Sequence, residues 1–151
     1  MNDISIAIVV AEYNKDITGP LLDGAINELS SCGVSVNSDD VVWVPGAVEL
    51  SVTAQEIAYV GNYDAIITFG AVIKGETDHY EYVSQHVTHG CQQASLATRV
   101  PIIFGVLTTP TREMALDRVG GKRGHHGREA AQAAIKMATV MREIRSKNTI
   151  S

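Results

Sequence analysis

Four short runs of apolar residues alternate along the chain with longer segments whose apolar residues recur at helical spacing. The runs are residues 4–10, 41–44, 65–69 and 102–107. The helical segments are residues 18–32, 48–59, 80–98 and 128–146, with a shorter one at 111–119. Runs this short and this rich in β-branched residues are typical of strands buried on both faces. Strands that alternate with helices predict an α/β fold, in which helices cover both faces of a four-stranded parallel sheet.

Turn and capping residues mark where these elements begin and end. Thr18 is suited to cap the first helix, with Pro20 in its first turn, and Gly33 is suited to end that helix. Residues 120–127 are expected to form a glycine-rich loop. No repeat, linker or low-complexity segment interrupts the sequence. We therefore expect one domain over residues 1–151, a three-layer sandwich of the flavodoxin-like type.

The four strands deliver the loops that follow them to one edge of the sheet, because parallel strands share one direction. These loops are residues 11–14, 45–49, 70–79 and 108–111. The third loop is the most informative, since it carries Gly75, Thr77 and His79 from a buried strand to the start of a helix. Free N–H groups at a helix start bind anions, and glycine lets an anion approach the main chain. A histidine beside such a site can transfer protons near neutral pH.

The formal net charge of −5 argues against a nucleic-acid partner. The basic residues near the last helix form only a local cluster, which suits a small anionic ligand. This cluster consists of Arg118, Lys122, Arg123 and Arg128. The N-terminal residues lack the features of a signal peptide, and no apolar run approaches the length of about 18 residues that a membrane span requires. We expect a cytoplasmic protein with no membrane partner.

The cysteines and histidines give no clear metal site or disulfide. Cys32 and Cys91 form no CxxC motif, so two buried reduced thiols are favoured over a disulfide. His86 and His89 lie three residues apart in a helical segment, and two further histidines stand at 125–126. No third ligand has the spacing of a zinc site, so we expect no bound metal.

Five motifs near the strand ends occur in the order and spacing of one enzyme family. They are EYN at 12–14 followed by IT at 17–18, VPGAVE at 44–49, GAVIKGETDH at 70–79, FGVLTT at 104–109, and the segment 118–127. Together these motifs resemble the 6,7-dimethyl-8-ribityllumazine synthases, the penultimate enzymes of riboflavin biosynthesis. The resemblance spans nearly the whole chain and implies a transferase that needs no cofactor. Such an enzyme condenses a 5-amino-6-ribitylamino-pyrimidinedione with 3,4-dihydroxy-2-butanone 4-phosphate and releases phosphate and water.

The resemblance implies which residues bind the pyrimidine substrate. Tyr13 stacks on the ring, where the family usually has Phe or Trp, and Val72 and Ile73 frame the heterocycle. The contacts to the ribityl chain come from Ala47, Val48 and Glu49. The alternative for Tyr13 is that it merely covers the end of the sheet. If the resemblance is ignored, a first-turn carboxylate favoured by the helix dipole explains Glu49 equally well.

The resemblance also assigns the phosphate of the second substrate to the third loop, at Lys74, Gly75, Glu76 and Thr77. Arg118 supplies the counter-charge, because a guanidinium pairs with two phosphate oxygens. His79 transfers protons during imine formation, phosphate elimination and ring closure. Without the resemblance, Arg118 would be a helix-capping cation. The alternative for His79 is a structural histidine, although this one follows the predicted anion site. The atypical Asp78 is expected to weaken phosphate binding.

Two residues bear on assembly and on departures from the family pattern. Phe104 stands where the family presents a ring to a neighbouring subunit, which implies a site shared within a homopentamer or a larger assembly of pentamers. His126 stands where a second lysine is common, so we expect weaker pyrimidine binding that improves as the pH falls toward about 6. Asp78 and His126 favour an alternative function, a non-catalytic shell protein that binds flavin or lumazine. A generic flavodoxin-like phosphate binder would not account for five motifs in register.

Overall fold

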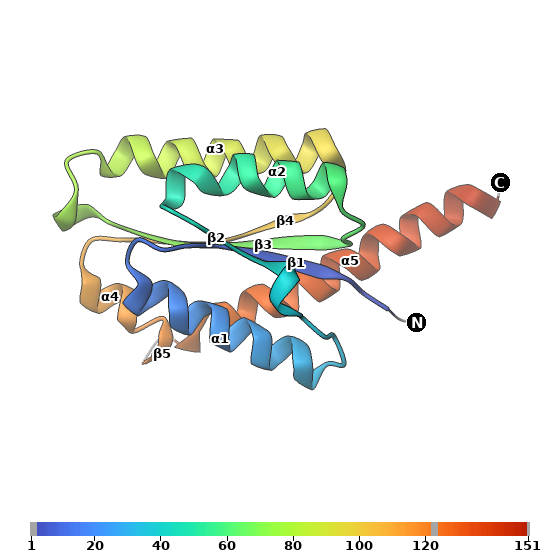
Figure 1. Cartoon of the computed structure of the whole chain (residues 1–151), viewed down its shortest axis with the longest axis horizontal. Helices are drawn as coiled ribbons and strands as arrows, with labels where there is room; N and C mark the ends of the chain where they lie inside the picture. Colours follow the sequence, from blue (N-terminus) through green and yellow to red (C-terminus); the bar gives the residue numbers. More distant parts are fainter. Residues whose placement is uncertain (1–2, 122–123, 151) are drawn as a thin grey trace.

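The chain forms a sheet of four parallel strands in the order β2-β1-β3-β4 (Figure 1). The computed structural model describes residues 3–121 and 124–150. The sheet strands are β1 (Ile6–Ala11), β2 (Val41–Val44), β3 (Ala65–Ile73) and β4 (Ile102–Thr109). The helices are α1 (Lys15–Ser31), α2 (Leu50–Val60), α3 (Tyr80–Thr98), α4 (Arg112–Leu116) and α5 (His126–Ile150). The predicted α/β fold, a flavodoxin-like three-layer sandwich, is confirmed.

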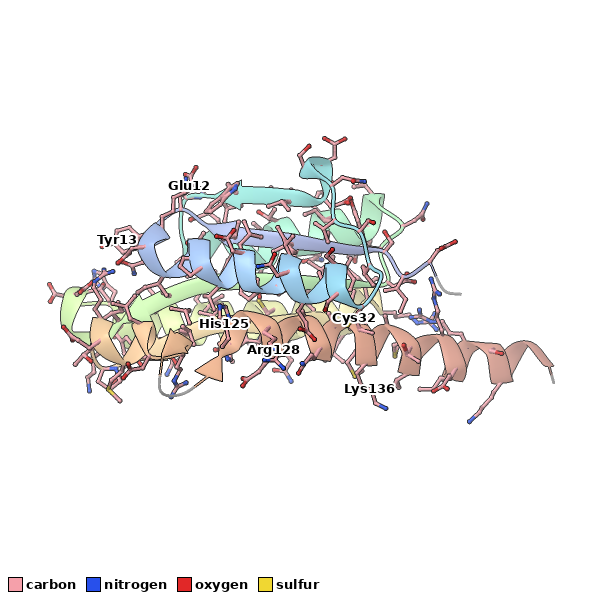
Figure 2. All side chains as sticks on the ribbon, turned by 90° about the horizontal axis from the view of Figure 1, so that it is seen from below. Glu12, Tyr13, Cys32, His125, Arg128 and Lys136 are labelled. Carbon is pink, nitrogen blue, oxygen red and sulfur yellow. The ribbon has the colours of Figure 1, made fainter. Side chains whose placement is uncertain are left out.

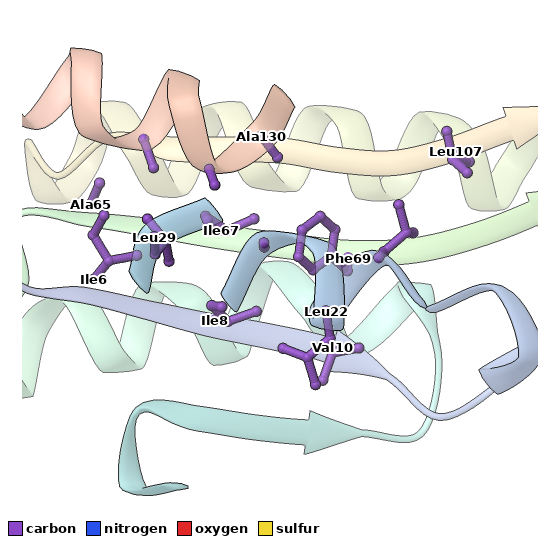
Figure 3. Packing of buried hydrophobic residues seen from close by; sticks show 14 of the residues in the cluster. Ile6, Ile8, Val10, Leu22, Leu29, Ala65, Ile67, Phe69, Leu107 and Ala130 are labelled. Carbon is purple, nitrogen blue, oxygen red and sulfur yellow. The ribbon is translucent and has the colours of Figure 1, made fainter. Parts of the chain in front are cut away.

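Helices α2 and α3 cover one face of the sheet, and α1, α4 and α5 lie on the other (Figure 1). Every residue of β1 and β3 is buried, which explains why these strands lack a polar alternation. Alternate side chains of β3 enter different cores. Ile67 and Phe69 pack toward α1 and α5, among the side chains that Figure 3 draws, whereas Ile66 packs toward α2 and α3. The two central strands therefore hold the loops at their ends on a rigid base.

Strands β3 and β4 are longer than the apolar runs predicted. The predicted strand at residues 65–69 continues to Ile73, and the one at 102–107 continues to Thr109. Gly70 consequently lies inside a strand, paired with Val106, rather than in a turn. The reason is that β4 offers a parallel partner for every added residue of β3, and this pairing satisfies main-chain groups despite the glycine and threonines.

Helix α1 begins four residues earlier than a cap at Thr18 predicts. Its N-cap is Asn14, which adopts a left-handed conformation with φ 62° and ψ 44°. The hydroxyl of Thr18 instead donates a 2.7 Å hydrogen bond to the carbonyl oxygen of Ala11, the last residue of β1. Pro20 therefore lies inside the helix rather than in its first turn. Gly33 follows the helix with φ 82°, a conformation suited to glycine.

The predicted loop before the last helix contains a small antiparallel ribbon, β5 (Val119–Gly121) and β6 (Gly124–His125). Helix α5 then starts at His126, two residues earlier than predicted. The His125 ring packs against the backbone of Gly24 in α1, where a Cβ atom would lie 2.7 Å from both ring nitrogens (Figure 2). The predicted basic residues Lys122 and Arg123 lie outside the described residues.

The two cysteines have different surroundings. Both are free, but only Cys91 is buried, and Cys32 is exposed at the end of α1. The prediction of two buried thiols is therefore wrong for Cys32, because α1 ends at Ser31 and Cys32 is its C-cap residue, in an exposed turn. Within residues 3–121 and 124–150, no helix is long and apolar enough to cross a membrane.

Candidate functional site

Backbone hydrogen bonds tie together the loops that follow β1 and β2. The N–H of Glu12 donates to the carbonyl oxygen of Val44 at 2.7 Å, and the N–H of Tyr13 donates to that of Pro45 at 3.0 Å. The loops after β3 and β4 also meet, since a Cβ atom on Gly75 would lie 3.6 Å from the Pro110 carbonyl oxygen. The four loops form one rim at the carboxyl edge of the sheet, as the parallel topology requires.

A cavity of about 260 Å³ opens on this rim. It lies at the point where the strand order changes direction, because β2 and β3 lie on opposite sides of β1. Ligands of open parallel sheets commonly bind at such a switch point. The walls come from three loops and the first turns of α3. They are Tyr13, Asn14, Gly46, Ala47, Val48, Glu49, Ala71, Val72, Ile73, Glu76, Thr77 and Val83.

An aromatic ring and aliphatic walls give the cavity its flat, apolar character. Tyr13 is 63% exposed at the open end, near the start of α1 (Figure 2). The side chains of Val72 and Ile73 are buried at the end of β3. A planar heterocycle between Tyr13 and this wall would gain stacking and apolar burial.

Glu49 lies where the β2 loop turns into α2. One of its carboxylate oxygens, Oε1, accepts a 2.9 Å hydrogen bond from the N–H of Gly46, and the side chain also lines the cavity. The single-turn helix Ala47–Glu49 presents Ala47 and Val48 to the same space. Glu49 can therefore both stabilise the start of the helix and bind a ligand, because the hydrogen bond to Gly46 fixes its carboxylate beside the cavity.

The segment that leads from β3 into α3 forms a single-turn helix, Lys74–Glu76, followed by extended backbone at Thr77. The N–H of His79 donates a 3.1 Å hydrogen bond to the Thr77 hydroxyl, and His79 is the N-cap residue of α3. Its imidazole is exposed and does not line the cavity. Lys74 and Thr77 line a second cavity of about 310 Å³ next to it. Thr77 belongs to both cavities, which places His79 at their margin.

Besides Lys74, Gly75 and His79, three more predicted site residues do not line this cavity: Phe104, Arg118 and His126. Phe104 is on the edge strand β4, opposite Thr68, and is 38% exposed. Arg118 follows α4, and its carbonyl oxygen accepts a 2.7 Å hydrogen bond from the N–H of His126.

The imidazole of His126 stays neutral to lower pH than an ordinary histidine. Burial is the largest cause that lowers its pKa below 6.5, and the charge of Arg118 and His125 lowers it further. Glu129, with Oε1 3.7 Å from Nδ1 of His126, opposes this shift. The gain in pyrimidine binding expected near pH 6 therefore moves to lower pH, because the charge that would cause it forms later.

Sequence reasoning missed two residues that organise the rim, Asn14 and Arg112. Asn14 lines the cavity and belongs to the first motif, but its role depends on a left-handed conformation that the sequence does not reveal. Arg112 opens α4 and bonds to residues of two other loops. A cation at a helix N-terminus is unfavourable, because it faces the positive end of the helix dipole. The position of Arg112 in the sequence therefore indicates that specific partners stabilise its charge. The hydrogen bonds that Arg112 donates, first to Glu76 and then to Asp16, raise the pKa of its guanidinium.

Within the described residues, no group of three or more His, Cys, Asp or Glu side chains is arranged to hold a metal ion. The cavity walls in that part of the chain also include no Lys, Arg or His. The described residues of one chain thus give the cavity a stacking ring, two carboxylates (Glu49 and Glu76) and a hydroxyl, but no cation for a phosphate.

Comparison with known proteins gives a consistent result. The model of the family described as 6,7-dimethyl-8-ribityllumazine synthase matches residues 3–142. Similar proteins include the 6,7-dimethyl-8-ribityllumazine synthases of Coxiella burnetii strains CbuG_Q212, RSA 493 / Nine Mile phase I and Dugway 5J108-111. Each is 49% identical over 143 residues, which cover 95% of this chain and 95% of the relative.

Proposed function

The chain belongs to the 6,7-dimethyl-8-ribityllumazine synthase family of riboflavin biosynthesis, and from that premise we propose the reaction that it catalyses. It condenses 5-amino-6-ribitylamino-pyrimidinedione with 3,4-dihydroxy-2-butanone 4-phosphate to 6,7-dimethyl-8-ribityllumazine, and releases phosphate and water. The observation that carries the proposal is the cavity at the switch point, which combines an aromatic ring, an apolar wall, a carboxylate and a hydroxyl from three loops. No cofactor takes part.

The pyrimidine substrate occupies the cavity between Tyr13 and the end of β3. Its ring stacks on Tyr13 and lies against Val72 and Ile73. The ribityl chain follows the segment Ala47–Glu49, where the Glu49 carboxylate accepts hydrogen bonds from its hydroxyl groups. Because Gly46 already holds one oxygen of Glu49, that carboxylate is positioned before the substrate arrives.

The phosphate of the second substrate binds at the turn formed by Lys74, Gly75, Glu76 and Thr77. Gly75 allows close approach to the main chain, and the Thr77 hydroxyl donates to a phosphate oxygen. His79, next to this turn, transfers the protons that the reaction moves. The free amine of the pyrimidine attacks the ketone, water leaves to form an imine, phosphate is eliminated, and the remaining nitrogen closes the ring with loss of water. Holding both reactants in place supplies much of the rate gain, up to about 7–11 kcal/mol for good orientation.

A second copy of the chain completes the site. The cavity is open and lacks a cation among the described residues, while Phe104, Arg118 and His126 lie elsewhere on the same chain. A neighbouring copy that presents these three residues would close the cavity with a ring, a phosphate counter-charge and an imidazole. Apolar side chains left exposed on α2 and α3, among them Val52, Tyr82 and Leu96, are consistent with such contacts. The assembly is a homopentamer or a larger assembly of pentamers.

The proposal is tested with steady-state kinetics on both substrates. Arg118→Ala should raise the KM of the phosphorylated substrate, and His79→Ala should lower kcat by about 10²–10⁴-fold without abolishing turnover.

A second experiment, in which the Arg118→Ala and His79→Ala variants are mixed during refolding, tests whether the site is shared between subunits. If Arg118 serves the neighbouring cavity, about one quarter of the interfaces in a 1:1 mixture regain both residues, and activity rises above that of either variant. Activity that stays at the mean of the two variants would contradict a shared site.

A further inference from the structure

The guanidinium of Arg112 joins three loops of the rim. Its Nε and Nη2 donate to the two carboxylate oxygens of Glu76 at 3.1 and 2.8 Å. Nη2 also donates to Oδ1 of Asn14 at 2.6 Å, and Nη1 donates to Oδ2 of Asp16 at 2.5 Å. Two of these partners, Asn14 and Glu76, line the cavity.

The charges in this cluster do not cancel. Glu76 and Asp16 carry two negative charges, and Arg112 carries one positive charge. Glu76 belongs to the turn to which the proposed function assigns the substrate phosphate, and a phosphate monoester carries close to two negative charges at neutral pH. A carboxylate in that turn without a partner would repel the phosphate.

We propose that Arg112 is a positioning residue for the phosphorylated substrate. It neutralises Glu76 and holds its carboxylate toward Asn14 and Asp16, so that the main chain of residues 75–77 stays open to an anion. This inference rests on the proposed function for the assignment of phosphate to the turn. This charge-compensating role can be distinguished from a purely structural one. If the pair only held the loops together, loss of both Arg112 and Glu76 would be as harmful as loss of Arg112. If Arg112 compensates the charge of Glu76, it is no longer needed once Glu76 is made neutral.

The experiment compares Arg112→Met, Glu76→Gln and the double variant. Arg112→Met should raise the KM of the phosphorylated substrate about tenfold, because two carboxylates then face the dianion. The kcat and the KM of the pyrimidine substrate should stay within about twofold of wild type. Glu76→Gln alone should lower the KM of the phosphorylated substrate, because it removes a negative charge from the turn and leaves the charge of Arg112 in place. The double variant should return within about threefold of wild type. A double variant as impaired as Arg112→Met would overturn the inference.

Two further variants separate charge from fold. Arg112→Lys keeps the charge without the guanidinium fork, so its KM should lie closer to wild type than that of Arg112→Met. Arg142 makes a similar pair with Asp64 before β3, at the opposite edge of the sheet, with distances of 2.8 and 3.4 Å. Arg142→Met is the matched control and should leave both KM values unchanged. If Arg112→Met does not fold, the comparison of Arg112→Lys, Glu76→Gln and the double variant decides.

Binding of inorganic phosphate, measured by titration calorimetry, gives a readout that does not require turnover. Wild-type protein should bind phosphate about tenfold more tightly than Arg112→Met, with the difference reduced at 0.5 M salt, about three times the physiological ionic strength. The double variant should bind like wild type. If this pattern holds and no lumazine forms, the proposed function fails and the inference about Arg112 stands. If lumazine forms but Arg112→Met binds phosphate as tightly as wild type, the inference fails and the proposed function stands.

Discussion

The side-chain amide of Asn14 donates a 2.9 Å hydrogen bond to the carbonyl oxygen of Ala71, and both residues line the cavity. This bond joins the loop after β1 to the end of β3. Asn14 also starts α1 in a left-handed conformation, which asparagine adopts more readily than most residues. One side chain therefore connects the start of a helix to both sides of the proposed pyrimidine site.

Replacing Asn14 separates its two roles. Asn14→Ala should lower the free energy of unfolding by about 2–3 kcal/mol, because it removes the hydrogen bonds with Ala71 and Arg112 and strains the backbone. Asn14→Gly loses the same two bonds without the strain and should be about 1 kcal/mol less damaging. Urea unfolding gives both values. Asn27→Ala, at an exposed position of α1, is the control and should change little. Equal losses for Ala and Gly would show that the backbone of Asn14 is unstrained.

Replacement of glycine by alanine should have opposite effects at two positions of α1. Gly24→Ala places a methyl group against the His125 ring and should be destabilising. Gly19→Ala meets no atom within 4 Å and should stabilise the helix by about 0.5–1 kcal/mol. In a His125→Ala background, Gly24→Ala should also become stabilising. Thermal unfolding of the four variants tests this, and a Gly24→Ala that stabilises the otherwise unchanged chain would refute the His125 contact.

His126 makes stability depend on pH in a defined direction. Burial lowers its pKa in the folded protein, so below about pH 6.5 the unfolded chain binds more protons than the folded one. The free energy of unfolding should therefore fall as the pH decreases from about 7.5 to about 5.5. His126→Gln should reduce this loss, as measured by urea unfolding at the two pH values. The same slope in both proteins would mean that other groups cause it.

The two cysteines should differ in reactivity. Burial raises the pKa of the Cys91 thiol, which lowers the fraction of reactive thiolate, while Cys32 is exposed. Iodoacetamide should alkylate Cys32 in the native protein and Cys91 only after unfolding, as peptide mass spectrometry can show. Comparable labelling of both residues before unfolding would indicate that α3 opens readily from the sheet.

The sequence predicted the parts of the fold that depend on continuous apolar runs. The bounds of β2 match because Asp40 and Pro45 flank its apolar run, and the bounds of the amphipathic helix α3 match as well. It did not predict that β3 continues through Gly70, since that extension depends on pairing with a strand more than thirty residues away. The ribbon before α5 was missed for a similar reason, because His125 is held by Gly24, far away in the sequence.

The candidate site could be predicted where it follows strand ends. Tyr13, Glu49, Val72 and Thr77 were expected on one rim, and they line one cavity. The partners of Arg112 could not be predicted, because they come together only when three loops meet. The contributions proposed for Phe104, Arg118 and His126 need a second chain, so neither one sequence nor one folded chain brings them to the cavity.

The most direct measurement follows lumazine absorbance and phosphate release together, with both substrates present and the uncatalysed reaction subtracted. The proposed function predicts that lumazine and phosphate appear in a 1:1 ratio, faster than in the absence of protein, and that Arg118→Ala slows both equally at low concentrations of the phosphorylated substrate. Tight binding of lumazine or riboflavin, without production of either product above background, would contradict it and indicate a protein that carries flavin-like ligands.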